Sequence, residues 1–477
     1  MVTRLGRSGV DPAPVIAFSL AFTLVLCLPQ ILNDSDTLWQ VRTGEWILAH
    51  HAIPSTDPFS FTAGDRPWFA HEWLAEMMMA LAYRAGGTHG MAGVMVLAAT
   101  AAGLTAALLL HHMRRFLLGI YAVLGLIVAL SNAAPSLLAR PHLLAWPCLV
   151  LWCGGLVTAR ADRTAPSFAL LPVMLVWVNL HGSFMIGLLL ACALLVEALF
   201  DTGANRRHVL ASWAAFILAA LAVALVNPDG VSGVLFPFHM LDMQSLAWIG
   251  EWQPPDFSRI QPLELMILAG LGLGLSGKVS LPPVRLLILL ALIHGALTHA
   301  RNEQLLGIVG ALILAEPLGT SLGRGPAIMP GRPWSSLMTG TALLAVLALA
   351  IRMLVPLSPE RTEAAFAATL ETVPPSLRVK PVLNEYGLGG QLIFQGVRPF
   401  IDSRADLYGD GFLTRYRRIA SPEQKALDDA LSEYGIAWTI FTTGHRIIPL
   451  LDQEPGWRRL IERDGLVIHV RDDSLPR

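Results

Sequence analysis

The sequence predicts a polytopic all-α membrane protein that ends in a small α/β domain. Two observations predict the membrane part: 54% of the 477 residues are hydrophobic and only 14% are charged, whereas soluble domains carry about 25% charged residues. Many separate apolar runs also approach the roughly 20 residues that cross a bilayer. The third observation is that charge rises and apolar runs shorten from residue 357 onward. The composition therefore excludes a soluble protein.

About eleven apolar runs are predicted to be helical spans. They cover residues 14–32, 88–112, 116–132, 136–158, 167–181, 184–200, 209–226, 262–276, 284–299, 303–318 and 334–356. The first run has the features of a signal peptide, but Leu28-Pro29-Gln30 offers no small-residue cleavage site, so we expect it to be retained. The four cysteines all lie in apolar runs and are expected to be small buried hydrophobic residues.

Basic residues predict the orientation of these spans. They gather in alternate loops, which contain Arg4, Arg7, Arg114, Arg115, Arg160, Arg163, Arg206, Arg207, Lys278, Arg285, Arg324 and Arg332. The opposite set of short loops contains only Arg140 and Arg301, both at span ends. The positive-inside rule then places the N-terminus in the cytoplasm. An odd number of spans places the tail from Pro356 onward outside, provided that the hairpins around 181–184 and 300–303 are both real.

Two parts are therefore predicted on the outer side. The first is the loop 33–87, in which 36–50 and 71–85 have the pattern of amphipathic helices with tryptophans suited to the interface. The second is an α/β domain over 357–477. Its predicted strands are "RPFIDSRADLYG", "IAWTIFTT" and "GLVIHVRD", and its predicted helix is 421–434. The domain organisation is thus 1–356 for the membrane part and 357–477 for the α/β part.

Polar residues concentrate at span ends on this outer side. They are Asp34, Asp36, His71, Glu72, Arg140, His142, Asn179, His181, Asn227, Glu251, Trp252, His299 and Arg301. Ionisable groups in or beside spans are costly, so each is a hypothesis for a functional residue. We expect them to converge on one site.

Each residue also has a structural interpretation. Asp34 and Asp36 are suited to cap the helix 36–50, and Arg140 is placed to extend its side chain to the outer headgroups. The segment "HEWLAE", which contains His71 and Glu72, lacks the second histidine of a zinc-protease helix, so that site is rejected. Asp402, Arg404 and Asp406 are expected to hold the α/β domain together rather than to close the site.

Acids and a guanidinium at an outer membrane surface suit group transfer from a lipid phosphate. Arginine pairing in a low-dielectric site stabilises a departing phosphate. The incoming hydroxyl is a poor nucleophile and needs a general base, which a carboxylate after the first span supplies. Two neighbouring acids raise one pKa toward neutrality. The sequence contains no nucleotide-binding motif, and no nucleic-acid partner is predicted.

The motifs resemble the GT-C superfamily of polyprenyl-phosphate-sugar glycosyltransferases. The matching features are the acid in "NDSDTLWQ" after the first span, a helical first outer loop, and many spans that end in an outer α/β domain. Further strings, "IPSTDPFSFT", "RPWFAHEWLAE", "ARPHLL", "VNLHGSF", "EWQPPDF" and "NEYGLGGQLI…FIDSRADLYGD", are similar to an uncharacterised bacterial subgroup over nearly the whole chain. Related enzymes include protein O-mannosyltransferases, the lipid A aminoarabinose transferase and the oligosaccharyltransferase catalytic subunit.

This resemblance implies inverting transfer, with Asp36 as the base, Asp34 as its cap or helper, and His71 and Glu72 as further catalytic candidates. The arginine that holds the lipid phosphate varies among relatives, so Arg140 and Arg301 are candidates by position only. The further substrate-binding candidates are His142, His181, Glu251, Trp252 and Arg404. Some relatives use a divalent cation and others do not. Asp34, Asp36 and Glu72 are the candidate ligands for Mg²⁺ or Mn²⁺.

The implied location is the bacterial inner membrane, with a periplasmic C-terminal domain, a polyprenyl-phosphate sugar donor and an unidentified acceptor. Two other functions stay open: a transporter or flippase for a lipid-linked glycan, and a non-catalytic assembly subunit. A transporter is expected to show paired broken helices and polar groups near the membrane midplane. Apart from His294, the ionisable groups lie at the outer rim, which favours the enzyme.

Overall fold

The computed structural model describes residues 11–64, 66–200, 206–322, 332–355 and 357–474. Arg4, Arg7, Arg324 and Pro356, which enter the orientation argument, lie outside them. Contacts divide the chain into two compact units. The helical unit comprises Met1–Leu28, Met95–Val234 and Gly250–Leu354, and the α/β unit comprises Pro29–Val94, Leu235–Ile249 and Val355–Arg477. The predicted boundary at residues 356 and 357 stays a prediction.

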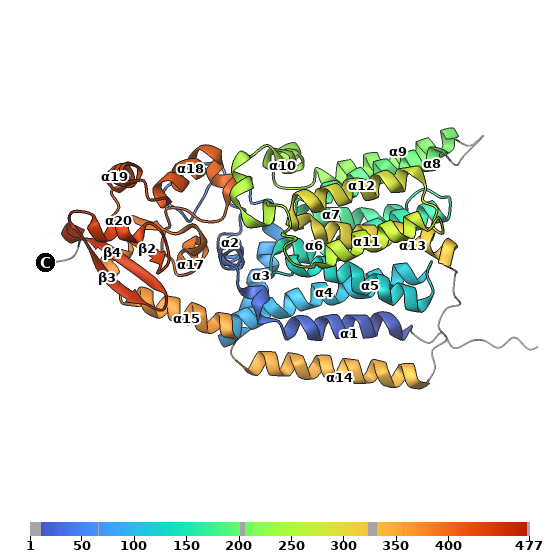
Figure 1. Ribbon diagram of the computed structural model, residues 1–477, viewed down its shortest axis with the longest axis horizontal. Helices are drawn as coiled ribbons and strands as arrows, with labels where there is room; N and C mark the ends of the chain where they lie inside the picture. The colour runs from blue at the N-terminus through green and yellow to red at the C-terminus, as the bar shows by residue number, and fades with distance from the viewer. Residues whose placement is uncertain (1–10, 65, 201–205, 323–331, 356, 475–477) are drawn as a thin grey trace, which may run out of the picture. The chain divides into compact units, whose positions relative to one another are not determined.

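Apolar helices build the helical unit. They are α1 Pro12–Leu26, most of α4 Gly90–Arg114, α5 Gly119–Ala133, α6 Pro141–Ala161, α7 Leu171–Leu180, α8 Phe184–Phe200, α9 Arg206–Ala224, α11 Pro262–Leu275, α12 Pro283–Thr298, α13 Glu303–Leu322 and α14 Arg332–Leu354. Figure 1 shows α1 and α14 side by side, although they are far apart in the sequence. Another apolar helix, α10 Val231–Leu241, was not predicted.

Each predicted span coincides with one of these helices, but their lengths differ. Among the described residues, six helices are long and apolar enough to cross a membrane: Gly87–Arg114, Gly119–Ser136, Pro141–Ala161, Arg206–Ala224, Ala300–Leu322 and Trp334–Leu354. The helices α1, α7, α8, α11 and α12 are apolar but shorter. The chain is therefore a multi-pass membrane protein, and a total of eleven spans stays a prediction.

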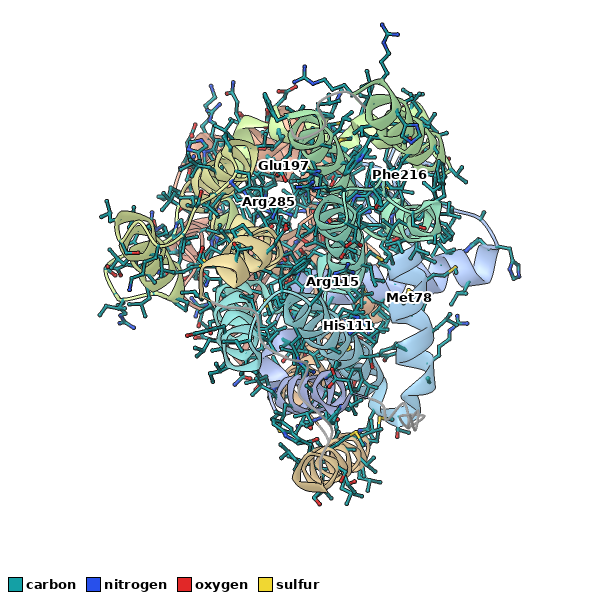
Figure 2. All side chains as sticks on the ribbon, turned by 90° about the vertical axis from the view of Figure 1, so that its right-hand side faces the viewer. Met78, His111, Arg115, Glu197, Phe216 and Arg285 are labelled. Carbon is teal, nitrogen blue, oxygen red and sulfur yellow. The ribbon has the colours of Figure 1, made fainter. Side chains whose placement is uncertain are left out.

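A buried ion network lies at the C-terminal end of α6. Glu197 accepts hydrogen bonds from Arg160 Nε at 3.3 Å and from Arg285 Nη2 at 3.0 Å, and Arg285 also pairs with Glu316 at 2.9 Å. Figure 2 labels Glu197 and Arg285 inside the bundle. Two arginines that the sequence argument used for orientation therefore also pair within the protein core.

The α/β unit combines helices of the first loop with a four-stranded sheet. Its first-loop helices are α2 Ser35–His50 and α3 Trp73–Ala85, so the two predicted helices are confirmed. The strands β1 Val382–Asn384, β2 Trp438–Thr442, β3 Trp457–Arg463 and β4 Leu466–Arg471 lie in the order β1-β2-β4-β3. The pair β1–β2 is parallel, and the other two pairs are antiparallel. The remaining helices are α15 Ser358–Glu371, α16 Pro375–Arg378, α17 Gly389–Phe394, α18 Ala405–Ala420, α19 Gln424–Glu433 and α20 Ile448–Gln453.

The strands predicted in "IAWTIFTT" and "GLVIHVRD" and the helix predicted over 421–434 are confirmed as β2, β4 and α19. The strand predicted in "RPFIDSRADLYG" is wrong. There the Asn384 side chain accepts from Phe400 N and donates to Ile401 O, both at 2.8 Å, so this extended backbone pairs with a side chain instead of a neighbouring strand. The helix α18 begins directly afterwards, at Ala405.

Within the α/β unit, residues 400–408 form hydrogen bonds with the first loop. The Arg66 guanidinium donates to Tyr408 O at 2.9 Å, and the Thr62 hydroxyl donates to Phe400 O. A Cβ added at Gly390 of α17 would lie only 2.1 Å from Ser35 O at the start of α2. The fold thereby fixes the N-terminal end of α2 against segments more than 300 residues later in the sequence.

Candidate functional site

The site in the α/β unit begins at the N-terminus of α2. Asp34 is the N-cap residue, with extended backbone, and its carboxylate accepts a hydrogen bond from Asp36 N at 2.9 Å. Aspartate is a preferred N-cap because its side chain satisfies a backbone N–H that the first helical turn leaves unpaired. The structure therefore gives Asp34 the capping role and leaves the carboxylate of Asp36 for other contacts.

The Asp36 carboxylate is oriented by two groups. Its Oδ1 accepts from Trp39 Nε1 at 3.3 Å, one turn along α2, and from the Ser403 hydroxyl. Trp39 Nε1 also lies 3.1 Å from Ser403 Oγ, so the three side chains form a triangle. Such contacts fix the direction of a carboxylate, which general-base catalysis requires.

The second acidic position lies at the start of α3. Glu72 Oε2 accepts from Gln40 Nε2 of α2 at 3.4 Å, and Glu72 Oε1 lies 3.7 Å from His71 Nε2. The ring of His71 packs against Phe236, with 4.3 Å between the ring centroids. The close approach of the helices needs a glycine, because a Cβ on Gly44 would lie 2.0 Å from Glu76 O.

A third carboxyl, Glu76, lies one turn beyond Glu72 and is only 1% exposed. Burial raises the pKa of Glu76 well above its ordinary value, and the neighbouring charges of Glu72 and Asp406 raise it further. The Oε2 atom of Glu76 has no hydrogen-bond partner among the described residues. The pKa of the partly buried Asp406 is also raised, chiefly by its removal from water. Glu76 therefore keeps its proton to a higher pH than an exposed glutamate does.

We expect the variant Glu76→Gln to gain stability relative to the wild type as the pH rises. The folded protein keeps the Glu76 proton at pH values where the unfolded chain, with a pKa near 4.5, has lost it. The wild type therefore loses free energy of unfolding above that pH, and the glutamine variant does not. Thermal unfolding from about pH 4 to about pH 8 measures the difference. A difference that does not change with pH would contradict the raised pKa of Glu76.

Arg404 forms a buried ion network at the start of α18. Its side chain is 1% exposed and pairs with Asp402 at 2.6 Å and with Asp57 at 2.7 Å. Its guanidinium also lies over the ring of Trp68, at 4.7 Å from the centroid. These charges hold the pKa of Arg404 well above its ordinary value against the cost of burial, and the pKa of Asp57 is lowered by the Arg404 charge against the same cost. With both carboxylates in place, the geometry favours a structural role for Arg404 over contact with a substrate.

The helical unit has its own polar cluster at the N-terminal end of α6. Glu251 bridges two arginines: its Oε2 lies 3.0 Å from Arg140 Nη1 and its Oε1 lies 3.2 Å from Arg301 Nη1. The guanidinium of Arg301 lies 4.3 Å from the centroid of the Trp252 ring, within the range of a cation–π contact. Both arginines remain partly exposed, at 20% and 28% of their side-chain surfaces.

The predicted histidines lie beside this cluster. His142 Nε2 lies 2.7 Å from Ser136 O, and the rings of His142 and His181 are 6.1 Å apart. His181 Nδ1 lies 2.9 Å from the Ser183 hydroxyl. His299 Nδ1 lies 2.6 Å from Trp252 O. The helical unit thus brings together the predicted residues Arg140, His142, His181, Glu251, Trp252 and Arg301.

Three residues of the site were not predicted: Asp57, Glu76 and Ser403. Glu76 follows Glu72 at helical spacing on a predicted amphipathic helix, and that spacing is the signal that could have found it. Asp57 and Ser403 carry no such local signal. Within the described ranges, no group of three or more histidine, cysteine or acidic side chains is placed to hold a metal ion. Metal dependence stays open.

Solved structures of membrane transferases share this fold. The apo oligosaccharyltransferase of Archaeoglobus fulgidus has a TM-score of 0.53 at 11% identity, over 90% of this chain and 69% of that chain. AglB from the same organism, in complex with an inhibitory peptide and a dolichol-phosphate, has a TM-score of 0.57 at 11% identity, with the same coverage. ArnT from Cupriavidus metallidurans, bound to undecaprenyl phosphate, has a TM-score of 0.55 at 12% identity, over 96% of this chain and 97% of that chain.

At the level of sequence, no family model and no curated protein matches the chain. At these low identities, the structural matches establish the fold and leave the chemistry to the residues themselves. Their coverage of 90% to 96% of the chain means that the likeness is not confined to a few apolar helices. The chain has the fold of these oligosaccharyltransferase and ArnT structures, which agrees with the resemblance seen in its sequence motifs.

Proposed function

We propose that this protein is an inverting glycosyltransferase that moves a sugar from a polyprenyl-phosphate donor to a lipid, glycan or protein acceptor. The observation that carries the proposal is the Asp36 carboxylate, oriented by Trp39 and Ser403 at the start of α2, in a chain with the GT-C fold. The matched AglB and ArnT structures contain a dolichol-phosphate and undecaprenyl phosphate, which supports a lipid-phosphate donor.

The proposed reaction is a single displacement. Asp36 accepts the proton of the acceptor hydroxyl as the oxygen attacks the anomeric carbon from the face opposite the phosphate. A new C–O bond forms, the bond between the anomeric carbon and the phosphate oxygen breaks, and polyprenyl phosphate leaves with the electron pair. The configuration at the anomeric carbon is inverted. Trp39 and Ser403 hold the direction of the carboxylate but do not take the proton.

Arg140 and Arg301 are proposed to bind the donor phosphate. Each pairs with Glu251 and keeps part of its side chain exposed, at 20% for Arg140 and 28% for Arg301, and a guanidinium carries five N–H donors that suit phosphate oxygens. Charge-assisted bonds from arginine are among the strongest contacts to phosphate and stabilise a leaving group as its charge develops. Glu251 then fixes the two guanidinium groups and offsets part of their charge.

We expect Arg301→Gln to lower kcat/KM for the donor by about tenfold or more, because one charge-assisted hydrogen bond contributes roughly 1.5–3 kcal/mol. Steady-state transfer at several donor concentrations measures the change. Arg259→Gln is the matched control, since Arg259 is exposed in a loop of the same unit. Equal kinetics for both variants would remove Arg301 from the proposed donor site.

The proposed location is the bacterial inner membrane, with a cytoplasmic N-terminus and the α/β domain in the periplasm. The proposal includes eleven spans, because an odd number of spans places the N-terminus and the α/β domain on opposite sides of the membrane. Labelling of single cysteines in the segment 357–474 of intact cells tests it. Labelling by a membrane-impermeant reagent is expected, and protection until the cells are broken would overturn the orientation.

The alternative is a transporter or flippase for the same class of lipid-linked sugar. Profiling of envelope lipids and glycans in a deletion strain separates the two functions. Loss of a transferase is expected to leave one glycan, lipid or protein without a sugar while the polyprenyl-phosphate sugar accumulates. Restoration of that product by the wild type but not by Asp36→Asn supports the transferase, and restoration by both contradicts it.

A further inference from the structure

A pocket of about 450 Å³ lies in the α/β unit, apart from the carboxylate of Asp36. It is lined by Arg42, Trp46, Arg84 and Arg398 among others, which come from α2, from α3 and from the segment after α17. Pockets that bind small molecules have volumes of roughly 300–1,000 Å³. The pocket is therefore large enough for a small molecule or a lipid headgroup.

The helical spacing of α2 separates this pocket from the proposed catalytic acid. Arg42, Glu45, Trp46 and Ala49 line the pocket; Glu45 and Trp46 lie three and four residues after Arg42, and Ala49 lies four and three residues after them, which places all four on one helix face. Asp36 lies six residues before Arg42, which places it on a different face of the same helix. The pocket is a separate site, and its binding chemistry can be tested without reference to sugar transfer.

The lining has an excess of two positive charges, since three arginines face one glutamate. Glu45 pairs with Arg42 at 2.6 Å on a partly exposed helix surface, where such a pair contributes little stability. Neither Arg84 nor Arg398 forms an ion pair within the described part of the chain. Arg398 uses Nη2 to donate to Ser60 O at 2.9 Å, which keeps most of its guanidinium for another acceptor.

A phosphomonoester fits this arrangement better than a carboxylate does. Its charge of about −1.5 to −2 at neutral pH balances the excess of the lining, whereas a carboxylate carries a single charge. The planar guanidinium groups of Arg84 and Arg398 match phosphate oxygens with paired N–H bonds. The aromatic rings of Trp46 and Phe59 also line the pocket and provide an apolar surface for the rest of the ligand. We propose that this pocket binds the phosphate group of a phosphorylated sugar or of a lipid phosphomonoester.

Calorimetric titration of the full-length protein in detergent tests the proposal. The two probes are glucose 1-phosphate and dioctanoyl phosphatidic acid, and their controls are glucose and dioctanoylglycerol. We expect one probe to bind saturably and its control without phosphate to bind at least about tenfold more weakly. Binding of glucose 1-phosphate identifies a sugar phosphate as the ligand class, and binding of phosphatidic acid identifies a lipid phosphate.

Variants assign the binding to the pocket. Arg84→Gln with Arg398→Gln is expected to raise the Kd by at least about tenfold. Arg84→Gln alone changes a side chain without an ion pair in the described chain, so its effect is measurable even where the double variant folds poorly. Arg415→Gln with Arg418→Gln is the matched control, because these arginines lie on α18 and do not line the pocket.

Two results would overturn the proposal: no saturable binding of either probe, or equal binding by the wild type and the Arg84 variants. Asp36→Asn is expected to bind the probe as the wild type does. Failure of the pocket and failure of the transferase mechanism are therefore distinguishable, since the first is measured by binding and the second by sugar transfer.

Discussion

Asp36→Asn is expected to lower the rate of sugar transfer by at least about a hundredfold, because a general base typically contributes a factor of 10²–10⁴. Asparagine keeps the shape of the side chain and still accepts the hydrogen bonds from Trp39 and Ser403 through its carbonyl oxygen. It does not accept a proton from the acceptor hydroxyl. The measurement is the initial rate with a labelled polyprenyl-phosphate sugar, beside the thermal stability of the same preparation.

Asp34→Asn is the matched comparison for this variant. Asparagine caps a helix about as well as aspartate, so the hydrogen bond from Asp36 N is kept. We expect its loss of activity to be much smaller than that of Asp36→Asn. Full activity in Asp36→Asn would refute the assigned base, and equal losses in both variants would refute the distinction between base and cap.

Arg404→Met is expected to destabilise the protein by about 3–5 kcal/mol, which is the usual effect of removing one partner from a buried ion pair. The change leaves the carboxylates of Asp402 and Asp57 buried without their counter-charge. Because Ser403 precedes Arg404 and contacts Asp36, we also expect transfer to fall. Thermal or denaturant unfolding of the detergent-solubilised protein measures the change in stability.

Arg415→Met is the control variant, because it removes an arginine from an exposed ion pair in the same unit. Its partner is Glu433, and both side chains are well exposed, at 39% and 53%. Exposed pairs contribute about 0–1 kcal/mol, so little change is expected. Similar destabilisation by the two variants would show that the Arg404 network does not hold the unit together.

The helices of this fold could be predicted from the sequence, because the residue patterns that indicate a helix are local. Apolar runs located the helices of the bundle, and amphipathic patterns with tryptophan located α2 and α3 before any contact was known. The sequence does not predict whether the short helices cross the bilayer, since length and composition alone do not fix the depth of a helix in the membrane. The segment before α18 was wrongly predicted to be a strand. The side chain of Asn384 forms hydrogen bonds with its backbone groups, and no pattern near Phe400 in the sequence predicts this pairing.

Only part of the candidate site could be predicted, because only some of its residues lie in a local sequence pattern. Asp36 stood out because an acid follows an apolar run, but Ser403, which orients it, is 367 positions away. Arg404 was noted as a polar residue, but its pairing with Asp57 joins positions 347 apart. Such contacts depend on tertiary packing, which a single sequence does not encode in any local pattern. Glu251 was noted too, whereas its position between Arg140 and Arg301 emerged only from the structure.

The most direct test of the proposed function is a reaction in detergent, where no membrane separates donor from acceptor. The purified protein is incubated with a polyprenyl-phosphate sugar of defined anomeric configuration and an envelope extract as the acceptor. We expect release of polyprenyl phosphate in equal amount to sugar transferred, and a product with the opposite anomeric configuration. Absence of transfer under these conditions would contradict the enzyme, and a product with retained configuration would contradict the single displacement by an Asp36-activated hydroxyl.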